Sequence, residues 1–243
     1  MTFKPFQYWL ITISSLCLIS NHCFASSLSG EIKIKKSALN FATESNSPKN
    51  IMVILEPINQ NFKAQPRTSK THQIKMTHKE FIPGYKIIQT GDKVNFSNLE
   101  SFKHNVFSSS QGNQFDLGSY TQHNQNKVKT WQQFNSSGLV KIYCNIHGQM
   151  AAFVYVSNSP FFALTDSDGK FEINQIPAGR YQLLAWNVRG EMKKQIEIID
   201  DKNQSINLLL DYSSYIKKPH FNKNNQTYPV INENEYDSSY EDF

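Results

Sequence analysis

A cysteine, a histidine and a methionine are evenly spaced in the stretch Cys144-Asn-Ile-His147-Gly-Gln-Met150, and a second histidine, His104, lies upstream. This spacing places a thiolate, an imidazole and a thioether on one short loop between two strand-like segments. Two His, one Cys and a weak axial Met form the donor set of a mononuclear copper site, because soft sulfur favours Cu(I) and imidazole suits both oxidation states. An arrangement that serves both states needs little rearrangement, which is what fast electron transfer requires.

Each of these residues alone has an ordinary structural explanation. A lone Cys beside a strand is usually a small buried apolar residue, and Met usually fills a core. All four residues in this spacing favour a metal site. Zinc fits less well, because Met is rarely a zinc ligand and structural zinc sites prefer more thiolates. The other histidines beyond residue 25 are expected to be exposed or to belong to the C-terminal tail: His72, His78, His123 and His220.

The first segment, residues 1–25, has the pattern of a secretory signal peptide: a lysine near the start, a short apolar run, and small residues up to Ala25. The run is well under the roughly 20 apolar residues that cross a bilayer. Cleavage near Ala25 would make the mature protein periplasmic or secreted. A lipid anchor at Cys23 is the alternative, in a poor sequence context. Removal of the segment would leave Cys144 as the mature thiol, without an internal disulfide.

The rest of the chain shows strand periodicity and no convincing helical period. Apolar residues alternate or run together in short segments bounded by turn residues. The clearest such segments are 31–36, 51–55, 94–96, 139–143, 152–156, 171–173 and 181–185. A Ser-, Gln- and Asn-rich stretch, 108–127, is expected to be mostly loop. The pattern therefore predicts an all-β fold that brings His104 to the loop of Cys144.

The ligand motif and its surroundings, residues 72–157, resemble a cupredoxin. Gly91-Asp92-x-Val94-x-Phe96 precedes His104, and the short Cys–His–Met loop is most similar to amicyanin and to plastocyanin-like or methylamine-utilisation-like proteins. The resemblance implies a Greek-key β-sandwich or barrel that holds one copper ion. The ion's ligands would be the imidazoles of His104 and His147, the thiolate of Cys144, and Met150 in the axial position.

The same resemblance implies roles for residues beside the ligands. Asn105 would hydrogen-bond across to the Cys144 loop, and backbone N–H groups around Asn105 and Asn145 would tune the potential through the sulfur. The edge of His147 would be the electron exit, so a redox partner protein would dock there. Phe107 and Phe153 are candidates for an apolar patch around it; the alternative is that both fill the core, and for Phe153, on a strand, the core position is favoured.

Two further regions flank this module. Residues 165–171 and 176–181 resemble a carboxypeptidase-regulatory-like β-sandwich, which implies a second small, discontinuous sandwich made of residues 28–58 with 158–211. Asp166 and Asp168 are interpreted as turn residues and not calcium ligands, because a bidentate Glu at EF-hand spacing does not follow. Residues 212–243 are polar, Tyr-rich and acidic at the end, and are predicted to be a disordered tail.

The charge distribution and the motifs disfavour several functions for this chain, which has 243 residues and a net charge of +5. Nucleic-acid binding is disfavoured because the lysines are scattered and the tail is acidic. A hydrolase is disfavoured because no recognisable motif pairs a nucleophile with a base. We expect a copper-binding electron carrier that is exported, is not an enzyme and has no stable membrane insertion. The alternatives are copper storage, delivery or sensing, or an envelope scaffold with a vestigial site.

Overall fold

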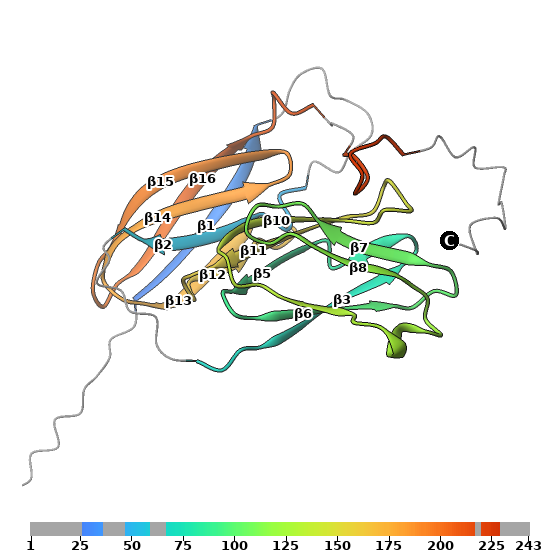
Figure 1. The fold of residues 1–243 in the computed structure, drawn as a ribbon. Helices are drawn as coiled ribbons and strands as arrows, with labels where there is room; N and C mark the ends of the chain where they lie inside the picture. Colours follow the sequence, from blue (N-terminus) through green and yellow to red (C-terminus); the bar gives the residue numbers. More distant parts are fainter. Residues whose placement is uncertain (1–25, 36–46, 59–66, 217–219, 229–243) are drawn as a thin grey trace, which may run out of the picture.

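The structure, a computed structural model, describes residues 26–35, 47–58, 67–216 and 220–228. Strands make up nearly all of its regular structure, so the all-β prediction is confirmed (Figure 1). Within the described residues, no helix is both apolar and long enough to span a bilayer. The expected signal peptide, residues 1–25, lies outside the described residues.

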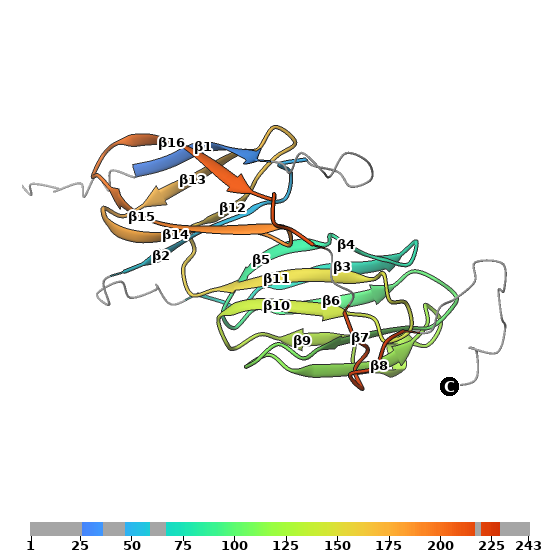
Figure 2. The same ribbon diagram turned by 90° about the horizontal axis from the view of Figure 1, so that it is seen from above.

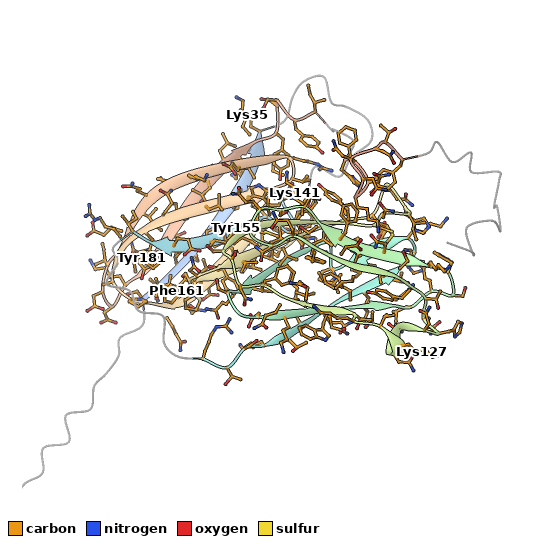
Figure 3. All side chains as sticks on the ribbon, in the orientation of Figure 1. Lys35, Lys127, Lys141, Tyr155, Phe161 and Tyr181 are labelled. Carbon is orange, nitrogen blue, oxygen red and sulfur yellow. The ribbon has the colours of Figure 1, made fainter. Side chains whose placement is uncertain are left out.

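One group of strands comes from both ends of the chain. Its members are β1 (Ser26–Lys35), β2 (Met52–Pro57), β12 (Phe162–Leu164), β13 (Lys170–Ile176), β14 (Gly179–Asn187), β15 (Gly190–Ile198) and β16 (Asn203–Asp211). They form two sheets, ordered β13-β1-β16 and β12-β2-β14-β15. We call this group the outer sandwich. Alternating apolar residues face its core, where Phe161 and Tyr181 meet edge to face at 6.0 Å (Figure 3).

The second group is continuous in sequence, and we call it the inner sandwich. It comprises β3 (Thr71–Thr77), β4 (Glu80–Ile82), β5 (Tyr85–Gln89), β6 (Lys93–Asn98), β7 (His104–Ser108), β8 (Phe115–Tyr120), the 3-10 helix η1 (Gln125–Lys127), β9 (Trp131–Gln133), β10 (Gly138–Tyr143) and β11 (Ala151–Ser157). Its two sheets are ordered β5-β11-β10-β7-β8 and β4-β3-β6-β9. The burial pattern of β6 explains why the inner sandwich forms. Val94, Phe96 and Asn98 are buried and alternate with partly exposed residues, as expected for a strand with one face on a core.

The two sandwiches meet along an apolar interface, with the inner one below the outer one in Figure 2. Phe153 of β11 lies 5.4 Å from the ring of Tyr85 and 5.4 Å from that of Trp186, measured between ring centroids. Leu184 and Ile87 belong to the same cluster. Strands β2 and β12 pair directly although the inner sandwich separates them in sequence.

Two regions that were not predicted to contain strands or packed residues differ from that expectation. Strand β8 lies within the stretch predicted to be mostly loop, where Tyr120 is fully buried and its hydroxyl donates to the carbonyl of Phe96 at 2.8 Å. Within the predicted disordered tail, the structure describes residues 212–216 and 220–228, which contact the two sandwiches. Tyr212 packs into the outer sandwich core, and residues 220–228 pack on the inner sandwich. Aromatic side chains in the tail provide the apolar area that a disordered segment lacks. Residues 229–243 lie outside the described residues.

The Asp166–Asp168 hairpin forms a tight turn, as expected. Asp166 Oδ1 accepts hydrogen bonds from the N–H groups of Asp168 and Lys170, both at 2.9 Å. Gly169 has a φ of 81°, a left-handed conformation that glycine adopts without the strain that a Cβ would cause. The acidic side chain therefore stabilises the turn through backbone amides.

Candidate metal centre

Two neighbouring strands, β7 and β10, position three of the predicted ligands. His104 is the first residue of β7, and Cys144 directly follows β10. The two strands are adjacent, with Tyr143 paired to Phe107. His147 and Met150 lie on the tight loop that leads from β10 into β11. Sheet pairing thus brings together residues that lie far apart in sequence.

The side chains of His104, Cys144 and His147 converge. Their potential ligand atoms all lie within 4.8 Å of one another. The Nδ1 atoms of the two histidines are 3.1 Å apart, and Cys144 Sγ is 3.8 Å from Nδ1 of His147. Among the described residues, no other group of three or more His, Cys, Asp and Glu side chains is gathered in this way.

Burial keeps both imidazoles neutral at pH 7, the form that binds metals. Burial lowers the pKa of His147 to about 4, and the charge of Lys79, together with that of His104 whenever it is protonated, lowers it further. Burial also lowers the pKa of His104, although the carboxylate of Glu100 opposes this effect. His104 is fully buried and His147 is half-buried. Each neutral ring has one nitrogen lone pair that a metal can use, and the Nδ1 atoms of the two rings face each other.

Cys144 is buried, and burial raises the pKa of its thiol. Backbone N–H groups of Asn105, His147 and Ile146 oppose this shift. Those of Ile146 and His147 point at the sulfur over 3.4 and 3.5 Å. A cation that replaces the thiol proton would leave a thiolate already supplied with N–H donors.

Met150 is buried, and backbone hydrogen bonds close the loop around it. Its N–H donates to the carbonyl of His147 at 3.1 Å, and its carbonyl accepts from the N–H of Cys144 at 3.4 Å. Its side chain lies in the same core cluster as Cys144. The two imidazoles and the buried thiol that converge here are donors that fit copper.

Asn105 and Asn145, each next to a candidate ligand, are hydrogen-bonded to each other. The side-chain oxygen of Asn105 accepts from the backbone N–H of Asn145 at 3.2 Å. The amide group of Asn105 donates to Asp116 at 2.8 Å and to the carbonyl of Gly118 at 3.0 Å. This connection ties the strand that carries His104 to the loop that carries Cys144.

Sequence reasoning missed two residues of the site, Glu100 and Phe102. A carboxylate oxygen of Glu100 lies 2.7 Å from Nε2 of His104. The ring of Phe102 lies 5.1 Å from that of His104 and 5.8 Å from that of His147, between centroids. Both precede β7 on a loop, where no strand or helix period links them to the ligands.

The expected apolar patch around His147 is not made by Phe107 and Phe153. Phe107 is buried and faces the ring of Tyr143 at 6.1 Å. Phe153 is buried in the interface between the sandwiches, which is the core position weighed as its alternative. The aromatic ring beside His147 is Phe102, which is partly exposed.

The other histidines differ in their surroundings. His78 and His123 are exposed, as expected. His72 is partly buried, with Nε2 3.0 Å from a carboxylate oxygen of Asp92. His220 is not part of a free tail, because its ring stacks on that of Tyr143 at 4.0 Å.

Neither a protein-family model nor a curated protein matches the chain. Solved structures resemble part of the chain, and their sequence identity to it is low. A purple cupredoxin from Nitrosopumilus maritimus is 21% identical, with a TM-score of 0.30, over 35% of this chain and 99% of that one. A methionine-to-alanine mutant of amicyanin, in the Cu(I) state, is 16% identical with a TM-score of 0.31, over 36% of this chain and 82% of that one.

The copper-containing nitrite reductase from Thermus scotoductus SA-01 is 20% identical, with a TM-score of 0.33. The similarity covers 43% of this chain and 26% of that one. The names of these structures describe a cupredoxin, an amicyanin with Cu(I) and a copper-containing nitrite reductase. Similarity at this level does not assign a function, so the metal centre rests on its own geometry.

Proposed function

We propose that this chain is an exported copper protein of the cupredoxin type, and that it carries single electrons. The observation behind the proposal is the convergence of His104, Cys144 and His147 within 4.8 Å, next to a loop that buries Met150. Copper, when bound, would supply one-electron exchange between Cu(II) and Cu(I). One ion would be held by these four side chains, with the thioether as the weak axial ligand.

The chain's own residues favour electron transfer over substrate chemistry. Four protein ligands would leave no coordination position for a substrate, so we infer that the protein is not an enzyme. His104 and Cys144 are buried, so they would bind the ion from the inside of the sandwich. His147 is half-buried, and its exposed edge is the route by which a redox partner protein would reach the metal. The resemblance of the outer sandwich to a carboxypeptidase-regulatory-like domain stays a prediction.

The test is metal loading of the purified protein. Cu(II) should give an intense visible thiolate-to-copper band and a narrow copper hyperfine splitting in EPR. Cys144→Ser should abolish the band, while Ser205→Ala, at an exposed position on β16 of the outer sandwich, should keep it. A colourless protein that holds zinc, or no metal, would overturn the proposal.

A second measurement separates electron transfer from copper handling. Stopped-flow mixing with a small reduced redox protein should bleach the visible band rapidly and leave the copper bound. Slow bleaching combined with ready transfer of Cu(I) to a chelator would favour storage or delivery instead.

A further inference from the structure

A segment near the C-terminus, residues 220–228, lies on the loop that carries the candidate ligands. It appears in red beside β7 and β8 in Figure 2. The hydroxyl of Tyr228 donates to the carbonyl of Cys144 at 2.7 Å, across a sequence separation of 84 residues. We call this segment the C-terminal clasp.

The clasp has its own folded turn. The N–H of Asn222 donates to the carbonyl of Gln226, and the N–H of Asn225 donates to the carbonyl of Asn222, both at 2.9 Å. The side-chain oxygen of Asn222 also accepts from the N–H groups of Asn224 and Gln226, both at 2.9 Å. Such local bonds give a short segment a defined shape.

Hydrogen bonds join the clasp directly to Asn145 and Asp116, and through these two residues to Asn105, so that the four residues form a closed ring. The N–H of Lys223 donates to Asn145 Oδ1 at 3.0 Å, and the N–H of Asn145 donates to Asn105 Oδ1 at 3.2 Å. Asn105 Nδ2 donates to Asp116 at 2.8 Å, and the ammonium of Lys223 lies 2.8 Å from the other oxygen of Asp116. The clasp therefore bridges the neighbours of His104 and of Cys144.

Aromatic packing adds to these bonds. The ring of Tyr228 lies so close to Gly148 that a Cβ on Gly148 would be 2.8 Å from Cγ of Tyr228. The ring of His220 stacks on Tyr143 at 4.0 Å and meets the edge of Tyr228 at 5.2 Å. Gly148 directly follows His147, and Tyr143 directly precedes Cys144. The clasp thus contacts the ligand loop at its start, at Cys144 and beside His147.

We propose that the C-terminal clasp holds the ligand loop in its metal-binding shape and slows the release of copper, with Tyr228 as the main positioning residue. This proposal rests on the proposed copper function. A ligand leaves a bound metal only when its loop moves, and each bond to the clasp must break before the Cys144 loop can move. The glycine at 148 is needed because the Tyr228 ring occupies the space of a side chain.

The first test uses the full chain without metal. Hydrogen exchange of the amides in residues 144–150 should accelerate about fivefold in Tyr228→Phe, the loss of one hydrogen bond of ordinary strength. Tyr228→Ala should accelerate it further, because the ring is also lost. Phe221→Ala is the matched control, since Phe221 belongs to the clasp but is 49% exposed. Its exchange should equal that of the unmodified protein.

The second test is the clash at Gly148. Gly148→Ala should displace the clasp and match Tyr228→Ala in exchange rate, since the backbone at Gly148 is not left-handed and accepts a Cβ. In the Tyr228→Ala background, Gly148→Ala should add nothing, because the ring it would strike is gone. Additive effects of the two substitutions would contradict direct contact.

The third test is copper release from the loaded protein into excess Cu(I) chelator. Release should accelerate in the same order as exchange: Tyr228→Phe, then Tyr228→Ala and Gly148→Ala. Faster exchange with unchanged release would overturn the retention role, and unchanged exchange in all three variants would overturn the clasp itself. If the unmodified protein binds no copper, the proposed function fails, whereas the exchange data still decide whether the clasp holds the loop.

Discussion

A carboxylate oxygen of Glu100 lies 2.7 Å from Nε2 of His104, on the side of the ring that faces away from the other candidate ligands. The same carboxylate accepts hydrogen bonds from the backbone N–H groups of His78 at 3.0 Å and Lys79 at 3.2 Å. Burial would raise the pKa of Glu100, but His104 and these amides outweigh it and lower the pKa. The fixed carboxylate orients the imidazole and leaves Nδ1 toward the site.

Glu100→Gln should therefore weaken copper binding without unfolding the protein. The amide keeps an oxygen acceptor but lacks the charge that makes the imidazole a better donor, and loss of such a partner typically costs about tenfold to a hundredfold in metal affinity. Competition titration against a chelator measures the affinity. Glu80→Gln, at an exposed carboxylate on β4, is the control. Equal affinity in both variants would show that Glu100 has no part in orienting His104.

Met150→Leu separates the packing role of Met150 from its proposed role as a ligand. Met150 is 1% exposed, and Leu has a similar volume, so the free energy of unfolding of the metal-free protein should change by less than about 1.5 kcal/mol. The visible thiolate band should persist, because Cys144 remains. The reduction potential should shift, since the axial ligand tunes it. Voltammetry that gives the same potential for both proteins would contradict axial ligation.

The interface between the sandwiches should contribute substantially to stability. Phe153→Ala removes a buried ring from between Tyr85 and Trp186 and leaves a cavity, at an expected cost of about 3–5 kcal/mol. Urea unfolding followed by tryptophan fluorescence measures this. Leu209→Ala is the control, because Leu209 is 57% exposed and should change stability little. A small effect of Phe153→Ala would mean that the interface adapts to the loss.

Local pattern was enough to predict much of this molecule. Alternating residues predicted strands such as β6 and β10, and the spacing of Cys144, His147 and Met150 indicated the ligand loop. Features held by long-range contacts could not be predicted in the same way. The contact of Tyr228 with Gly148 depends on tertiary packing, and β8 is hidden in a polar stretch because its strand period rests on few apolar residues.

Asp92 forms the centre of a buried ionic network near the start of β6, and it is 2% exposed. One of its oxygens lies 2.8 Å from the guanidinium of Arg67 and 2.7 Å from the N–H of Lys70. The other lies 3.0 Å from both Nε2 of His72 and the N–H of Gln89. Burial would raise the pKa of Asp92, but these four donors outweigh it and lower the pKa from 3.8 to about 2.

The stability of the protein should therefore fall in acid through Asp92. Since the folded state has the lower pKa, the contribution is fully present above the unfolded value near 3.8 and is lost as the pH falls toward 2. The shift corresponds to about 2 kcal/mol. Urea midpoints from pH 6 to pH 2 should show the gap between the unmodified protein and Asp92→Asn narrowing over this window. Asp168→Asn, at an exposed turn, should run parallel to the unmodified protein. A gap that stays constant down to pH 2 would show that the charge of Asp92 does not stabilise the fold.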